Sequence, residues 1–137
     1  MGLTVIDAGV LIGFLDESDA HHDTSTRELE GARRKGAIVI PASALAESMV
    51  APARHGDASL DAVREFVERL PLGVAQLDAE MAIIAAQVRA QFGPRLKLPD
   101  ALVIATAINL EADFLIATDR GWPSSATLGF DGVIVTI

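Results

Sequence analysis

The order of apolar and polar positions along the chain predicts strands that alternate with helices. Five short apolar runs, most of them rich in β-branched residues, predict buried strands near residues 3–6, 37–41, 73–77, 114–117 and 133–137. Helical spacing of apolar residues or capping residues predicts helices over residues 10–15, 22–35, 43–50, 57–70 and 78–92, and another that begins at 99. Apolar strands that alternate with helices are typical of a parallel sheet covered on both faces.

Length and pattern together predict one domain. The chain has 137 residues, which suits a single compact unit. No repeat, linker or low-complexity segment interrupts it. We therefore expect one domain over residues 1–137, an α/β fold with three α/β/α layers and a mainly parallel five-stranded sheet.

Composition excludes several classes of function. The chain carries 19 acidic and 11 basic side chains, a net charge of −8, which excludes a broad basic surface for nucleic acid. It has no cysteine, so disulfides, thiolate zinc sites and cysteine nucleophiles are excluded. No apolar stretch approaches the roughly 20 residues of a membrane span, and the start lacks the basic region of a secretory signal. We expect a cytoplasmic protein without a membrane segment.

Four acidic residues fall where predicted strands end or the following helices begin. They are Asp7, Glu47, Asp100 and Asp119. The carboxyl ends of parallel strands share one edge of the sheet, where ligands of open α/β proteins bind. Clustered carboxylates repel one another, and a divalent cation such as Mg²⁺ or Mn²⁺ relieves this repulsion. Such ions activate water and stabilise the leaving oxygen in phosphodiester hydrolysis.

Each acid also has a purely structural explanation. Asp100 follows Pro99 and fits a helix cap, while Asp7 and Asp119 fit strand-end turns. Glu47 fits a solvated helix position. These explanations do not require the four acids to meet at one edge, so their joint placement favours a site.

Four segments in this order resemble the motifs of PIN-domain ribonucleases. They read VIDAGVLI at 5–12, SALAE at 43–47, LPDALVIATA at 98–107 and LIATDRGW at 115–122. The short chain resembles in particular the VapC toxins of type II toxin–antitoxin modules. The resemblance implies a Mg²⁺- or Mn²⁺-dependent endoribonuclease that cleaves cellular RNA, with Asp7, Glu47, Asp100 and Asp119 as its metal-binding and catalytic acids. It also implies a cognate VapB-like antitoxin and a homodimer.

The sequence departs from this pattern at two positions. Many relatives have Ser or Thr two residues after the first aspartate, where this chain has Gly9. Many also have Thr two residues before the last acid, where this chain has Ala117, with Thr118 displaced by one. Both changes remove hydroxyl groups that orient metal-bound water in a site of this kind.

Basic residues near the acids are candidates for contacts with the RNA backbone. Arg95, Lys97 and Arg120 flank the acidic motifs and are the candidate substrate-binding residues. Trp122 is expected to be a partly buried anchor near the site. The net charge of −8 argues against tight, unaided RNA binding.

An active nuclease of cellular RNA requires an inhibitor. An acidic site would attract an Arg or Lys of the antitoxin, with apolar anchors beside Leu11, Phe14 and Leu15. The helices over 57–70 and 78–92 are candidate interface elements of a two-fold dimer.

Three other functions are alternatives to the nuclease. A receiver domain needs a lysine after its fifth strand, but the only lysines are Lys35 and Lys97. A haloacid-dehalogenase-like phosphatase needs a second acid two residues after the first, where Gly9 stands. A PIN-like binding module without catalysis stays open, because the missing hydroxyls are compatible with it.

Overall fold

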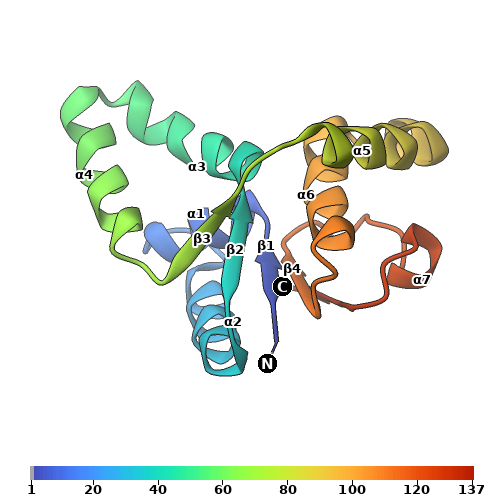
Figure 1. Cartoon of the computed structure of the whole chain (residues 1–137). Coiled ribbons are helices and arrows are strands. Elements are labelled where there is room, and N and C mark those ends of the chain that lie inside the picture. Colours follow the sequence, from blue (N-terminus) through green and yellow to red (C-terminus); the bar gives the residue numbers. More distant parts are fainter. Residues whose placement is uncertain (1) are drawn as a thin grey trace.

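A computed structural model describes residues 2–137 and confirms the predicted α/β architecture. Five parallel strands form one sheet in the order β3-β2-β1-β4-β5. Helix α2 lies on one side of this sheet and α6 on the other (Figure 1). The strands are β1 (Thr4–Ile6), β2 (Ile38–Pro41), β3 (Leu72–Ala75), β4 (Phe114–Ala117) and β5 (Val133–Thr136).

The helices largely follow the predicted pattern. They are α1 (Ala8–Leu15), α2 (His22–Lys35), α3 (Ala42–Arg54), α4 (Asp57–Glu68), α5 (Ala79–Phe92), α6 (Leu98–Asn109) and α7 (Ser125–Leu128), with a 3₁₀ turn η1 at Gly93–Arg95. Helix α3 continues past the predicted end at residue 50 and reaches Arg54. It includes Pro52, which lacks a backbone N–H and so removes one helical hydrogen bond in the last turn. The sequence pattern missed α7 and η1, which are too short to show helical periodicity.

The core lies around the central strand and the helix packed on it. Val5 and Ile6 of β1 are fully buried, as are Ala101, Ile104 and Ala105 of α6. Small alanines on the buried face of α6 let its backbone approach the sheet closely. This packing fixes the start of α6 near the end of β1.

Two aspartates cap helices with their side chains. The Val10 N–H donates to Asp7 Oδ1 at the start of α1 over 3.0 Å, and the Met81 N–H donates to Asp78 Oδ1 at the start of α5 over 2.9 Å. The helix predicted over residues 78–92 thus begins at a side-chain cap. Asp57, by contrast, is the first residue of α4, and Gly56 occupies the cap position.

No helix within residues 2–137 combines the length and the apolar character that crossing a membrane requires.

Gly36 joins α2 to β2 through backbone that only glycine adopts without strain. Its φ is +154°, and a Cβ on it would overlap the carbonyl oxygen of Gly2. The Gly2 N–H also donates to the Lys35 carbonyl oxygen over 2.7 Å. Both partners are backbone groups, so neither can rotate out of the way.

We predict that Gly36→Ala lowers the free energy of unfolding by about 2 kcal/mol or more, because it adds backbone strain and a clash. The matched control is Gly31→Ala inside α2, where a Cβ would meet no atom within 4 Å. That change should stabilise the protein by up to about 1 kcal/mol. Urea unfolding measures both, and equal effects of the two substitutions would contradict the prediction.

Candidate active site

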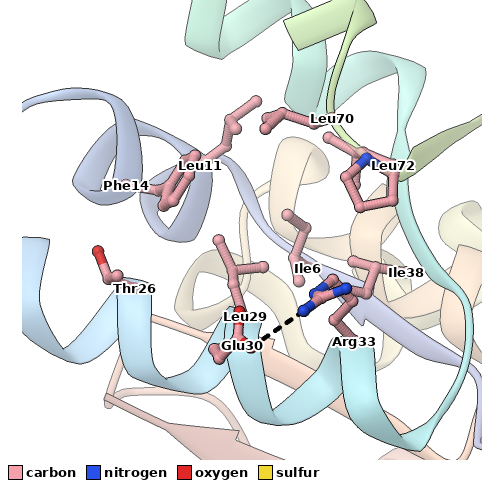
Figure 2. Close-up of a pocket in the computed structure, with 11 residues that line it drawn as sticks. Ile6, Leu11, Phe14, Thr26, Leu29, Glu30, Arg33, Ile38, Leu70 and Leu72 are labelled. Carbon is pink, nitrogen blue, oxygen red and sulfur yellow. Dashed lines mark hydrogen bonds and ion pairs between the residues drawn. The ribbon is translucent and has the colours of Figure 1, made fainter.

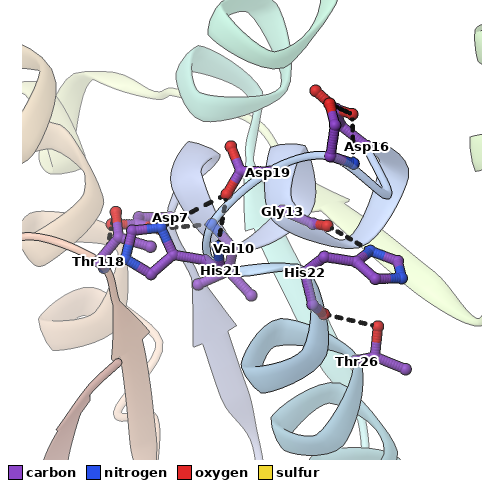
Figure 3. A network of polar contacts seen from close by, with 10 residues as sticks. Asp7, Val10, Gly13, Asp16, Asp19, His21, His22, Thr26 and Thr118 are labelled. Carbon is purple, nitrogen blue, oxygen red and sulfur yellow. Dashed lines mark hydrogen bonds and ion pairs between the residues drawn. The ribbon is translucent and has the colours of Figure 1, made fainter.

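Asp7 is a buried carboxylate at the junction of β1 and α1. Its side chain is 7% exposed. Oδ1 accepts the Val10 N–H, and Oδ2 accepts the Thr118 N–H over 3.0 Å (Figure 3). The Thr118 hydroxyl also donates to Oδ2, over a long 3.4 Å. Because β1 pairs with β4, residue 118 stands directly beside the end of β1. Both Asp7 oxygens are thus held in place.

The other three predicted acids come from different elements. Glu47 lies on α3, beyond the end of β2, and is exposed. Asp100 lies in the first turn of α6 and is half-buried. Asp119 follows β4 and is exposed, with its Oδ1 accepting the Gly121 N–H over 2.7 Å. The fold thus brings all four acids toward the edge where β1, β2 and β4 end.

Burial dominates the electrostatics of Asp7. Removal from water raises the pKa of Asp7, and the negative charge of Asp119 raises it further. Hydrogen bonds from Thr118 and Val10 oppose this rise because they stabilise the charged form.

Glu47 and Asp100 are affected in the same direction. Burial raises the pKa of Glu47, and the charges of Asp100 and Asp7 add to the rise. Burial also raises the pKa of Asp100, followed by the charge of Asp119, while the indole N–H of Trp122 lowers it and Asp7 raises it. Asp7 therefore interacts with each of the other three acids, and the four form one electrostatic cluster.

The structural explanations of single acids are only partly supported. Asp7 does cap α1, so this residue has a structural role as well as being a member of the acidic cluster. Asp100 does not cap α6, because Lys97 occupies that position and no capping hydrogen bond forms there. A half-buried carboxylate without a capping role calls for another explanation.

The donor set suits a divalent cation that prefers oxygen ligands. Across residues 2–137, however, no three acidic or histidine side chains are arranged closely enough to enclose an ion as they lie. Like charges push carboxylates apart, so a cation would have to draw them inward. Glu47 and Asp119 are exposed and have room to make that movement. The chemistry of the residues therefore fits a divalent cation.

The candidate substrate-binding residues surround the acids unevenly. Lys97 is the residue before α6, and its charge lowers the pKa of Asp100, so this charge reaches the cluster. Arg95 in η1 and Arg120 beside Asp119 are exposed, and neither forms an ion pair within the described part of the chain. All three side chains are thus available to an anionic ligand.

Trp122 is half-buried beside Asp100, as expected of an anchor near the site. Its indole nitrogen is shielded from solvent and has no hydrogen-bond partner among residues 2–137. Trp122 therefore lowers the pKa of Asp100 through the dipole of a nearby N–H group, without forming a hydrogen bond to it.

A groove of about 250 Å³ leads from Glu47 between α1 and the α3–α4 pair. Its walls are mostly apolar and include Ile12, Leu15 and Val63, with His55 further along. One member of the acidic cluster thus stands at the mouth of an apolar groove.

The sequence matches the model of the PIN domain family over residues 4–126. The chain belongs to the PIN domain family. The match includes all four acidic positions, and the predicted family resemblance is confirmed. No curated protein matches this PIN domain by sequence.

Several solved structures with less than 25% sequence identity share the fold of this PIN domain. One is VapBC2 from Rickettsia felis bound to promoter DNA, with a TM-score of 0.73 and 13% identity over 98% of each chain. FitAcB from Neisseria gonorrhoeae has a TM-score of 0.73 and 17% identity, covering 97% of this chain and 96% of its own. VapC20 from Mycobacterium tuberculosis, described as a toxin that cleaves the sarcin–ricin loop, has a TM-score of 0.73 and 18% identity, covering 95% of this chain and 98% of its own.

The sequence reasoning missed the role of Thr118 beside the first acid of the PIN domain. The threonine is displaced by one position from its usual place in the motif, yet both its N–H and its hydroxyl donate to Asp7. The pairing of β1 with β4 is the signal that reveals this contact, because Ile6 pairs with Ile116 and residue 118 therefore follows just beyond the position opposite Asp7.

We predict that Asp100→Asn raises the free energy of unfolding at neutral pH in EDTA. The folded state raises the pKa of Asp100, so it binds the proton more tightly than the unfolded chain does. The resulting penalty is fully present at neutral pH and is relieved as pH falls through the raised pKa. The gain from Asp100→Asn should therefore shrink between about pH 7.5 and about pH 4.5 in urea unfolding.

The comparison variant is Asp7→Asn, which should lose about 1 kcal/mol or more despite removing a charge. Asp7 accepts hydrogen bonds on both oxygens, and an amide NH₂ would face an N–H donor on one side. A stability gain in Asp7→Asn, or a loss in Asp100→Asn, would contradict this account of the cluster.

Proposed function

We propose that this PIN domain is a Mg²⁺- or Mn²⁺-dependent endoribonuclease that cleaves cytoplasmic RNA by phosphodiester hydrolysis. The observation that carries the proposal is the convergence of Asp7, Glu47, Asp100 and Asp119 into one acidic cluster with raised pKa values at three of its members. The description of VapC20 as an RNA-cleaving toxin supports the same reaction class.

In this proposal the surroundings of each carboxylate determine its role in holding the cation. Asp7, held by hydrogen bonds on both oxygens, is the fixed ligand. Asp100 is the second, anchored by the first turn of α6. Glu47 and Asp119 complete the donor set from exposed positions. A bound cation would supply the activation of water and the stabilisation of the leaving oxygen.

Glu47 is also suited to handle a proton. Its side chain is largely open to solvent at the edge where substrate would lie, and its pKa is raised by partial desolvation and by the charges of Asp100 and Asp7. A raised pKa moves a carboxylate toward the range in which general acid–base catalysis operates. Arg95, Lys97 and Arg120 would contact phosphates on either side of the cleaved bond.

We predict that Asp100→Asn abolishes cleavage of structured RNA in Mg²⁺ or Mn²⁺, since it removes a ligand and leaves the fold intact. The matched control is Asp131→Asn, an exposed aspartate before β5, at the opposite edge of the sheet from the acids. The control should cleave at the wild-type rate, and EDTA should stop cleavage by both active proteins. Binding without cleavage in the wild type would favour a binding module instead.

We further propose that this nuclease is the toxin of a toxin–antitoxin pair, neutralised by a VapB-like antitoxin. Its fold resembles that of a chain in a toxin–antitoxin complex from Klebsiella pneumoniae, with a TM-score of 0.70 and 20% identity. Apolar spaces lie on both sides of α1. One is the groove that starts at Glu47. The other is a cavity of about 240 Å³ walled by Leu11, Phe14 and Leu29, with Arg33 at its side (Figure 2).

These surfaces suit a segment that carries both a cation and apolar side chains. An Arg placed among the carboxylates would pair with them bidentately and compete with metal or substrate. Apolar residues next to it in the antitoxin would enter the groove beside Leu15 and Val63.

A second copy of the chain would cover a different surface. Leu77, Ile83 and Leu98 are 50%, 61% and 50% exposed at or near α5. Helix α4, the other predicted interface element, lies at the opposite end of the molecule (Figure 1), so one compact two-fold patch does not include both. We propose that the dimer forms through α5.

Light scattering distinguishes the two proposed surfaces. We predict a mass of two chains for the wild type and of one chain for Ile83→Asp, because a charge at α5 opposes the dimer. We predict that Val63→Asp dimerises normally but fails to bind the antitoxin encoded beside it. A monomeric wild type would contradict the dimer, and an intact complex with Val63→Asp would contradict the groove.

A further inference from the structure

The side chain of Thr118 lies directly against the backbone of Gly9. Gly9 lies in the first turn of α1, two residues after Asp7, and Thr118 directly follows β4. A Cβ on Gly9 would overlap the hydroxyl oxygen of Thr118 and would lie 2.8 Å from its Cγ2 and 3.0 Å from its Cβ. Real Cβ atoms do not approach other atoms this closely. The side chain of Thr118 therefore fills the volume that any side chain at position 9 would need.

The same side chain reaches the Asp7 carboxylate. Thr118 donates to Oδ2 through both its backbone N–H and its hydroxyl, over 3.0 Å and 3.4 Å. The N–H of Val10 holds the other oxygen. The orientation of Asp7 is thus set by the start of α1 on one side and by residue 118 on the other.

We propose that Thr118 is a positioning residue for Asp7, whose hydroxyl reaches the carboxylate from the end of β4 through space that only glycine at position 9 leaves open. The sequence lacks a hydroxyl two residues after the first aspartate, and the fold supplies one from a neighbouring strand end. This role rests on the proposed function, in which Asp7 holds a divalent cation. Groups that orient a metal ligand affect affinity without touching the ion.

Two substitutions separate the hydroxyl from the shape of the side chain. Thr118→Val keeps the shape and removes the hydroxyl, whereas Thr118→Ser keeps the hydroxyl and removes the methyl group. We expect Thr118→Val to bind Mn²⁺ about tenfold more weakly in titration calorimetry, and Thr118→Ser to bind within about twofold of the wild type. Thr106→Val is the matched control, because Thr106 is a buried threonine of α6 whose hydroxyl bonds to the Leu102 carbonyl oxygen. It should leave Mn²⁺ affinity unchanged.

Moving the hydroxyl tests the shared space directly. Gly9→Ser alone should lower the Tm by roughly 5 °C, because two side chains then compete for one volume. Combining Gly9→Ser with Thr118→Ala should restore both the Tm and the Mn²⁺ affinity. Additive losses in the double variant would overturn the proposal, as would wild-type Mn²⁺ affinity in Thr118→Val.

The outcomes distinguish this inference from the proposed function. Mn²⁺ binding that depends on Asp7 and Thr118, in a protein that cleaves no RNA, would refute the nuclease and support the positioning role. RNA cleavage and Mn²⁺ binding that are unaffected in Thr118→Val would do the reverse. A wild type that binds no Mn²⁺ would overturn both.

Discussion

A charged side chain buried at the end of the central strand is the constraint on which the rest of the structure depends. Asp7 is 7% exposed, and an unpaired carboxylate at that depth would not stay ionised. Its hydrogen bonds come from α1 and from residue 118. The pairing of β1 with β4 thus aligns two strands and also brings Thr118 to this carboxylate, where its hydrogen bonds favour the charged form against the effect of burial.

The acidic cluster opposes folding and also limits what the protein can bind. Burial and mutual repulsion raise the pKa values of three acids, which means that the folded state bears a cost at neutral pH. Sites that bind strongly charged partners commonly sacrifice stability in this way. In the proposed nuclease the same charges would repel RNA until a cation neutralised them, which would couple cation binding to substrate binding at this edge.

The sequence predicted those features that depend on local patterns or on a general rule of topology. Strand positions, the cap at Asp78 and the common edge of the four acids follow from periodicity, capping and the parallel sheet. It did not predict that the Thr118 hydroxyl reaches Asp7, or that Phe14 stacks on Phe66 with ring centroids 6.4 Å apart. Those contacts depend on strand order and on the path of α4. No local pattern contains that information.

The hydrogen bond from Thr118 to Asp7 joins residues 111 positions apart in the sequence. Contacts of such separation form late, since the loop between them must close before they contribute any stability. During synthesis the first carboxylate leaves the ribosome long before β4 exists to hold it. A nascent chain would therefore have no assembled cluster until nearly all of its residues had emerged.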